Sequence, residues 1–210
     1  KVYVINNAIE LTNFSYNKGI RDELRQELNI NDKFCIGNVG RFAHQKNHEF
    51  LIDIFHEIYK INNNSVLLLV GVGELENKIK EKVDKLKLNH CVIFLGLRDD
   101  VNRLYQVMDV FLLPSFHEGL GVVLIESQAS GLINYVSDTI TLEANVSNKI
   151  KYISLKKSSK YWAECIINYD KKNNRTDIVK NLISAGFSVE TEANKLVMIY
   201  KKLNKENGIF

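Results

Sequence analysis

Two glutamates in one stretch of this sequence have the spacing of groups that act on a ligand. Glu118 lies in a glycine-containing turn after the apolar run 110–113, and Glu126 follows eight residues later in a helical pattern. Glu126 shares a helix face with apolar residues, so its carboxylate needs hydrogen-bonding partners there. The free N–H groups at the start of the same helix can bind an anion. The stretch 115–131 therefore predicts a site for a ligand that carries phosphate and sugar hydroxyl groups.

Two cations, Arg41 and Lys46, follow a second predicted strand at 34–39. A guanidinium presents a fork of donors to a diphosphate, whereas a lysine ammonium is a compact and mobile point charge. Fixed cations stabilise a departing diphosphate more in the transition state than in the ground state. An ordinary role as solvated surface residues is the alternative for both, and the residue types alone do not decide between the two interpretations.

Apolar runs alternate with amphipathic patterns along the chain, which is typical of a parallel sheet covered on both faces. We therefore expect an α/β fold with a Rossmann-like, doubly wound parallel sheet of about six strands and helices on both faces. The chain, 1–210, is interpreted as one domain with a helical C-terminal part from about residue 158. The strand candidates are 2–5, 34–39, 66–70, 91–95, 110–113, 134–136 and 151–153. The helix candidates are 19–28, 48–59, 74–87, 99–106, 122–130 and, near the end, three segments of which the last is 189–203.

Ligands of such sheets bind beyond the carboxyl ends of the strands. Four loops are expected at that edge, and they cover 40–46, 71–73, 96–98 and 115–121. Asn47, after the first loop, is a predicted N-cap of the next helix. Small residues in these loops could let a ligand approach the backbone, although ordinary turn glycines are the alternative. The further candidate binding residues are Gly40, Gly73, Leu97, Arg98, Leu120, Gly121 and Val122.

The composition excludes several classes of function. The net charge is only +3 and the lysines read as scattered, so we expect no nucleic-acid partner. No apolar run approaches the ~20 residues that a membrane span needs. The three cysteines lie far apart, which indicates free thiols in a reducing cytosol. Asp99 and Asp100 are interpreted as helix-capping residues and His117 as a structural histidine, so no metal and no cofactor are expected.

Four segments resemble the C-terminal, nucleotide-sugar-binding domain of a family 4 glycosyltransferase with the two-domain GT-B fold. VGRFAHQKN at 39–47 resembles the family's phosphate-binding segment, and LLLVGVGEL at 67–75 resembles its strand and glycine turn. VIFLGLRDDV at 92–101 is similar to a third family segment. DVFLLPSFHEGLGVVLIESQASGL at 109–132 resembles its block of two glutamates separated by seven residues. The residues of these segments are similar to those of capsular and exopolysaccharide glycosyltransferases.

The resemblance implies a role for each candidate. Glu126 would accept hydrogen bonds from a ribose, Glu118 would contact the transferred sugar, and the N–H groups of Leu120 to Val122 would bind the diphosphate. Arg41 and Lys46 would stabilise the leaving group, while Arg98 would line the base pocket or remain a surface arginine. The expected reaction transfers a hexose from a UDP-sugar, with retention of anomeric configuration and no metal. The acceptor would be a saccharide or lipid-linked saccharide held by an N-terminal domain that this sequence lacks.

The resemblance also implies a place in the cell and leaves alternatives open. A cytoplasmic protein is expected, with at most peripheral association with the inner face of a membrane. Many relatives carry proline where this chain has Gly121 and Ile133, which would alter loop stiffness without removing a ligand group. A donor-binding subunit that needs a partner chain is one alternative, and a GT-B epimerase or phosphorylase is another. A dinucleotide-binding interpretation lacks the G-x-G-x-x-G turn at the first strand.

Overall fold

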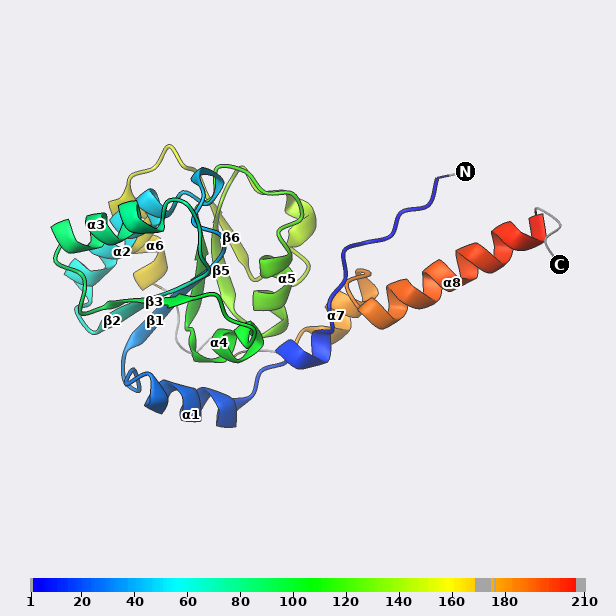
Figure 1. The fold of residues 1–210 in the computed structure, drawn as a ribbon, viewed down its shortest axis with the longest axis horizontal. Helices are drawn as coiled ribbons and strands as arrows, with labels where there is room; N and C mark the ends of the chain where they lie inside the picture. The colour runs from blue at the N-terminus through cyan, green and yellow to red at the C-terminus, as the bar shows by residue number, and fades with distance from the viewer. Residues whose placement is uncertain (1, 169–174, 176, 207–210) are drawn as a thin grey trace.

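A six-stranded parallel sheet forms the centre of the protein in a computed structural model that describes residues 2–168, 175 and 177–206 (Figure 1). Its strands lie in the order β3-β2-β1-β4-β5-β6, and every neighbouring pair is parallel. The doubly wound sheet predicted from the sequence is therefore confirmed. The strands are β1 (Phe34–Val39), β2 (Ser65–Val70), β3 (Val92–Gly96), β4 (Val110–Leu113), β5 (Ile133–Ser137) and β6 (Ile150–Ile153).

Helices cover both faces of the sheet (Figure 1). One face packs against α2 (His48–Ile61), α3 (Glu76–Lys85) and α6 (Ser159–Ile167). The other face packs against α1 (Lys18–Glu27), α4 (Val101–Val107) and α5 (Val122–Ala129). Three short 3₁₀ turns complete the body, and they are η1 (Leu11–Phe14), η2 (His44–Lys46) and η3 (Leu142–Ala144).

The continuous apolar run of β2 shows why these segments form a two-sided sheet. Leu67 and Leu69 join the core under α2, α3 and α6, whereas Leu68 joins the core on the opposite face. Successive side chains of a strand point to opposite faces, and both faces are covered here. Every position of β2 is therefore buried, and a strictly alternating pattern would not have suited it.

The C-terminal part contains three helices, as predicted, because α6 is followed by α7 (Val179–Ser184) and α8 (Val189–Glu206). Figure 1 shows α8 extending away from the sheet, beside the N-terminal segment at its base. The predicted strand at 2–5 is wrong: these residues form no strand, and Val2 is 93% exposed. A strand needs a neighbour for its backbone groups, and no described strand runs beside this segment.

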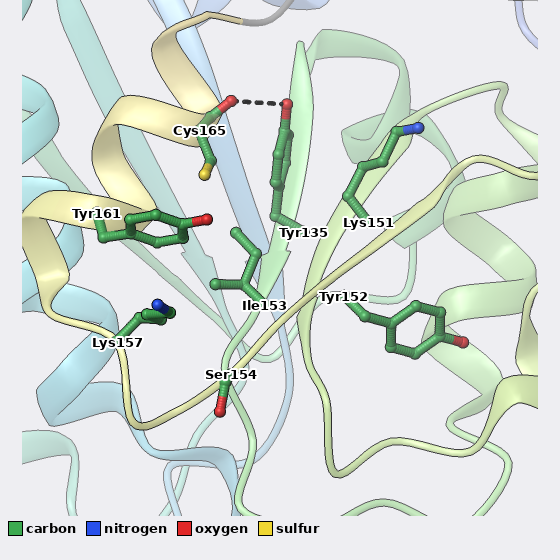
Figure 2. Close-up of a pocket in the computed structure, with 8 residues that line it drawn as sticks. All are labelled: Tyr135, Lys151, Tyr152, Ile153, Ser154, Lys157, Tyr161 and Cys165. Carbon is green, nitrogen blue, oxygen red and sulfur yellow. Dashed lines mark hydrogen bonds between the residues drawn. The ribbon is translucent and has the colours of Figure 1, made fainter.

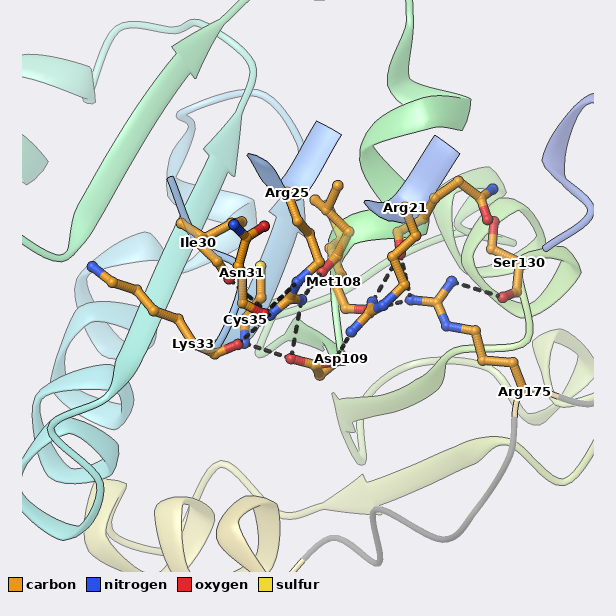
Figure 3. A network of polar contacts seen from close by, with 12 residues as sticks. Arg21, Arg25, Ile30, Asn31, Lys33, Cys35, Met108, Asp109, Ser130 and Arg175 are labelled. Carbon is orange, nitrogen blue, oxygen red and sulfur yellow. Dashed lines mark hydrogen bonds and ion pairs between the residues drawn. The ribbon is translucent and has the colours of Figure 1, made fainter. Parts of the chain in front are cut away.

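Three arginines converge at the amino edge of the sheet, next to Asp109 (Figure 3). Arg21 Nη2 lies 2.5 Å from Asp109 Oδ1, and Arg175 donates to Ser130 O at 3.1 Å. Arg25 is buried, and its guanidinium donates to four backbone carbonyls, those of Ile30, Asn31, Lys33 and Val107. This network joins α1, the start of β1 and the α4–β4 connection, so its role is structural.

Candidate functional site

A cleft of about 550 Å³ lies beyond the carboxyl ends of β1, β2 and β3. Residues from three of the four predicted loops line it, including the candidates Gly40, Arg41, Gly73, Leu97 and Arg98. Gly71 and Val72, in the predicted loop 71–73, also line it, whereas sequence reasoning missed three apolar residues of the lining, which are Val39, Val70 and Val101. The fourth loop, 115–121, does not line this cleft, but it contacts the first loop, which does.

A buried ion pair connects the fourth loop to the first. Lys46 Nζ lies 2.7 Å from Glu118 Oε1, and the two side chains are only 15% and 6% exposed. Gln45 supports the pair, because its Nε2 donates to Glu118 Oε2 at 3.5 Å and to His117 O at 2.9 Å. The two loops follow β1 and β4, where the strand order reverses, which is the place where open α/β sheets bind ligands.

Asn47 has a different role from the one predicted. It occupies the N-cap position of α2, but its backbone is left-handed (φ 54°) and its side chain makes no capping hydrogen bond. Its Nδ2 donates instead to Pro114 O at 3.1 Å. Phe116 N also donates to Gln45 O at 2.8 Å, so the loops after β1 and β4 form one connected unit. The cap prediction is wrong because a tertiary contact uses the amide.

The two arginines of the cleft are each held by a nearby carboxylate. Arg41 is exposed, and its Nη2 lies 3.0 Å from Glu74 Oε2. Arg98 forms two hydrogen bonds with Asp100, at 2.7 and 2.6 Å, which hold the pKa of that carboxyl below its ordinary value. Asp100 is the N-cap residue of α4, yet it makes no side-chain capping bond, because Arg98 occupies its carboxylate. A guanidinium has five N–H donors, so both arginines retain donors for a ligand.

Two glycines beside the cleft allow the loops to approach each other. A Cβ at Gly71 (φ 131°) would lie 2.2 Å from Gly40 O, and one at Gly73 would lie 2.6 Å from the backbone of Phe42. No L side chain fits in either place. The two glycines therefore allow close contact between two loops of the protein, and both also line the cleft.

Helix α5 begins immediately after the turn that contains Glu118. Gly121 is left-handed (φ 65°), and Val122 is the first helical residue. Leu124 N donates to Gly121 O at 2.8 Å, and the N–H groups of Val122 and Val123, which precede this first bond of the helix, can serve a bound anion. Leu120 is half-buried, and its side chain lines a separate cleft of about 480 Å³ beside Asn6. Only the backbone of Leu120 thus remains a candidate for anion binding.

Glu126 is half-buried on α5 and accepts a hydrogen bond from a tyrosine. The hydroxyl of Tyr105, a buried residue of α4, donates to Glu126 Oε2 at 2.8 Å. Burial raises the pKa of the Glu126 carboxyl above its ordinary value, although the tyrosine hydrogen bond opposes the shift. Among the described residues Glu126 forms no ion pair, so the alternative of a lysine bridge is not realised. Sequence reasoning missed Tyr105, which reads as an ordinary core residue.

Two histidines near the site differ in their surroundings. His48 is buried and stacks on Phe42, with ring centroids 4.3 Å apart. Neither of its ring nitrogens has a hydrogen-bond partner within the described residues, and burial lowers its pKa to about 4. The His117 side chain, predicted to be structural, is exposed at the rim beside Glu118. That prediction is wrong because the turn points this side chain to solvent.

No cluster of three or more histidine, cysteine, aspartate or glutamate side chains suited to a metal ion occurs within residues 2–168, 175 and 177–206. Cys35, Cys91 and Cys165 are free thiols, and the first two are buried. None of the helices in the same described ranges is both long and apolar enough to cross a bilayer.

Comparisons with known proteins cover most of the chain. The family model described as "Glycosyl transferases group 1" matches residues 20–185. EpsF of Bacillus subtilis is 32% identical over 204 residues, which cover 95% of this chain and 53% of EpsF. The UDP-Gal:alpha-D-GlcNAc-diphosphoundecaprenol alpha-1,3-galactosyltransferase of Escherichia coli is 29% identical over 216 residues, which cover 95% of this chain and 54% of that enzyme. The chain thus spans about half the length of these curated relatives.

A solved structure shares the fold. HepE of Anabaena, in complex with UDP-glucose, superposes with a TM-score of 0.81 at 21% sequence identity. The match covers 95% of this chain and 57% of HepE. At this identity the likeness concerns the fold, which is one half of a GT-B glycosyltransferase.

Proposed function

The chain belongs to the group 1 glycosyltransferases, and from this membership we propose that it is the donor-binding half of a retaining enzyme that transfers a hexose from a UDP-sugar. The acceptor is a growing surface polysaccharide or a lipid-linked saccharide. One observation carries the proposal: the Lys46–Glu118 pair, at 2.7 Å, joins the loop of the 550 Å³ cleft to the turn where α5 begins. A cleft, fixed charges and a helix start then meet at one edge.

The site offers a place for each part of a UDP-sugar donor. The base and ribose enter the cleft at the ends of β1 to β3, near Arg98. The diphosphate binds between Arg41, Lys46 and the first N–H groups of α5, which are positive groups from two elements. The transferred sugar lies beside Glu118, whose carboxylate accepts from sugar hydroxyls. Glu126, already anchored by Tyr105, accepts from the ribose through its second oxygen.

Catalysis by these residues is mainly electrostatic. As the bond between sugar and diphosphate breaks, negative charge grows on the leaving phosphate, and cations held in place stabilise it without reorganising. Glu118 and Gln45 hold the loop of Lys46 before a ligand arrives. An ammonium has three donors, so Lys46 can keep Glu118 and bind a phosphate oxygen as well. On the same face of the sugar, the leaving phosphate assists deprotonation of the acceptor hydroxyl, which retains the configuration.

Relatives support the choice of donor and acceptor. The E. coli relative is named for UDP-galactose and a diphosphoundecaprenol-linked acceptor, and HepE was solved with UDP-glucose. By analogy this chain takes a UDP-sugar, and the acceptor binds a further N-terminal domain of the size that the relatives have in addition. We place the enzyme in the cytoplasm, with peripheral association at the inner face of the membrane. Arg41 and Lys46 take the part that a metal has in other transferases.

Calorimetric titration with UDP, GDP and ADP tests the proposal. We expect UDP to bind, with at least about tenfold weaker binding in Arg41→Ala and Glu126→Ala, which corresponds to about 1.4 kcal/mol or more. Arg103→Ala is the matched control, because Arg103 is another partly exposed arginine paired with a glutamate, Glu23, at 3.6 Å. Absence of binding for all three nucleotides at millimolar concentration would overturn the proposal, as would unchanged affinity in both variants.

Turnover separates a donor half from a complete enzyme. Because the 210-residue chain spans about half the length of its curated relatives, we expect it to bind UDP but to transfer sugar poorly. The measurement is release of UDP from a UDP-sugar, with and without a saccharide acceptor. Efficient, acceptor-dependent release by this chain alone would contradict the division of labour proposed here.

A further inference from the structure

A second pocket, of about 380 Å³, lies at the open edge of the sheet where β6 ends and α6 begins (Figure 2). Lys157, just before α6, and Tyr161, in its first turn, face Tyr135 and Ile153 across the pocket, whereas the side chain of Lys151 points away on the other side of Tyr135. Strand β6 pairs only with β5, so its outer edge is not covered by another strand. The pocket shares no lining residue with the cleft described above.

The surroundings of this pocket carry unneutralised positive charge. The twelve residues 149–160 contain five lysines and no acidic residue. Within the described residues none of these lysines forms an ion pair. Burial, together with the nearby charge of Lys151, lowers the pKa of Lys149, as expected in a positive potential. The interpretation of the lysines as scattered is therefore wrong for this stretch, where five of them lie within twelve residues of the sequence.

The pocket offers hydrogen-bond donors and no carboxylate. The hydroxyl of Tyr135 already donates to Cys165 O at 3.1 Å (Figure 2), and that of Tyr152 donates to Thr141 O at 3.1 Å. The ammonium groups of Lys151 and Lys157 have no hydrogen-bond acceptor among the described residues, and Lys157 Nζ lies 5.0 Å from the ring centroid of Tyr161. Such a lining complements a ligand that supplies both negative charge and acceptor oxygens.

The place of the pocket relates it to the sugar chemistry of the main site. Both lie at the carboxyl edge of the sheet, because Ile153 and Ser154 stand at the end of β6. The Lys46–Glu118 pair lies at the ends of β1 and β4, and β6 is two strands away from β4. At ~4.8 Å per strand this separation is about 10 Å across the sheet. A saccharide of a few units at one place can reach the other.

We propose that the pocket at the β6 edge binds an acidic saccharide whose units carry carboxylate or phosphate groups, with Lys157 on one side of Tyr135 and Lys151 on the other each contacting a separate negative group. The anion site rests on the pocket itself, while the choice of a saccharide rests on the proposed function. A nucleic-acid ligand is disfavoured because Lys157 covers a face of the aromatic ring that a base would stack on. A membrane surface is disfavoured because the aliphatic residue of the lining, Ile153, is buried and cannot insert into a bilayer.

The only tryptophan of the chain provides a local signal for the test. Trp162 is buried beside the pocket, and its Nε1 donates to the carbonyl of Ser154, a lining residue, at 3.2 Å. The full chain is titrated with a glucuronic acid tetrasaccharide, with glucose 6-phosphate and with neutral cellotetraose. Tryptophan emission and calorimetry are followed together. We expect saturable binding of the charged ligands, weakening with added salt, and at least tenfold weaker binding of cellotetraose.

Charge-reversal variants identify the residues. Lys151→Glu/Lys157→Glu is expected to weaken the tetrasaccharide by at least tenfold, while Lys85→Glu, a charge reversal at an exposed lysine of α3, stays within twofold. Affinity for UDP should be unchanged in all variants, which also shows that they are folded. If the wild-type chain binds the tetrasaccharide but not UDP, the result contradicts the proposed donor site and does not contradict the proposed saccharide site.

Four results would overturn the proposal. The wild-type chain would bind neither charged ligand at millimolar concentration, or the double variant would bind as well as the wild type. Cellotetraose would bind as tightly as the charged tetrasaccharide. Finally, a tetranucleotide or vesicles of anionic phospholipid would bind more tightly than the tetrasaccharide, through the same two lysines, and so assign the patch to another partner.

Discussion

The two edges of the sheet both contain partly buried charge, but they differ in how much hydrogen-bonding capacity is left. At the amino edge Arg25, with a side chain 6% exposed, donates to four carbonyls and pairs with Asp109. At the carboxyl edge Lys46, 15% exposed, has Glu118 as its only described ion-pair partner. The comparison teaches that a charge marks a binding site only where its donors are not already used by the protein.

The difference follows from the direction of the helices. In a βαβ arrangement the helices end at the amino edge of the sheet. Their last carbonyls have no hydrogen-bond donor within the helix, so they attract cations. Arg25 and Arg21 meet the carbonyls at the end of α4 in this way. Helices begin at the carboxyl edge, so their free N–H groups there attract an anion. Helix α5, after Gly121, is the described example beside the Lys46–Glu118 pair.

Arg25→Met should give the largest effect, and it concerns stability alone. The variant leaves four carbonyls and Asp109 with fewer partners in a buried place, and we expect a loss of about 3–5 kcal/mol in the free energy of unfolding. Urea denaturation measures it, and Arg103→Met, at a more exposed arginine, should cost less than about 0.5 kcal/mol. Affinity for UDP in the folded protein should not change. A variant as stable as the wild type would contradict the structural role of the amino edge.

His48→Phe should remove a pH dependence of the free energy of unfolding. It comes from His48, which is buried beneath the carboxyl edge. Burial lowers the pKa of His48 from 6.5 to about 4, so the unfolded chain binds more protons between these values. Stability attributable to this residue is therefore fully present above pH 6.5 and is lost as the pH falls towards 4, by up to about 3 kcal/mol. Thermal or urea unfolding of the variant should show a flatter profile. His117→Phe, at an exposed histidine, should keep the wild-type slope, and a retained slope in His48→Phe would refute the assignment.

Lys46→Met should separate binding from stability at the carboxyl edge. We expect UDP affinity to fall by about 10–100-fold, because the diphosphate loses a fixed cation, and stability to fall by about 1–2 kcal/mol, because Glu118 loses its partner. The double variant Lys46→Met/Glu118→Gln should regain most of that stability without regaining affinity. Calorimetry and urea unfolding provide the two readouts. If affinity returned together with stability, the pair would be a structural one like that of the amino edge.

Glu126→Gln should give the smallest effect, about 3–10-fold in UDP affinity at neutral pH. Burial raises the pKa of this carboxyl. The free protein therefore loses some stability as the pH rises from the ordinary pKa of a glutamate through the raised pKa of Glu126. Ribose hydroxyls donate best to the ionised form, so affinity should increase over the same pH range. The variant should lose that difference, as measured by calorimetry at a series of pH values. An identical pH profile in both proteins would exclude Glu126 from the ribose site.

Much of the site could be predicted from the sequence because it depends on local patterns. Apolar runs and glycine turns predict the strands and the four loops, and the parallel sheet places those loops at one edge. The prediction fails where a side chain finds a distant partner. The amide of Asn47 binds Pro114 and does not cap α2, and Gly73, which lines the cleft, also makes room for the backbone of Phe42. Lys151 and Lys157 line one pocket only because the segment before α6 lies beside β6.

By itself the sequence determined the alternation of elements, the two-sided core and the residue types at the carboxyl ends of the strands. Hydrophobic periods of two and 3.6 residues are local, so they can be recognised in the sequence without knowledge of the fold. Only the tertiary structure decided the partners. Lys46 meets Glu118 across 72 residues and Tyr105 meets Glu126 across 21. These contacts depend on strand order, which brings β4 beside β1, and no local pattern specifies which βα units become neighbours.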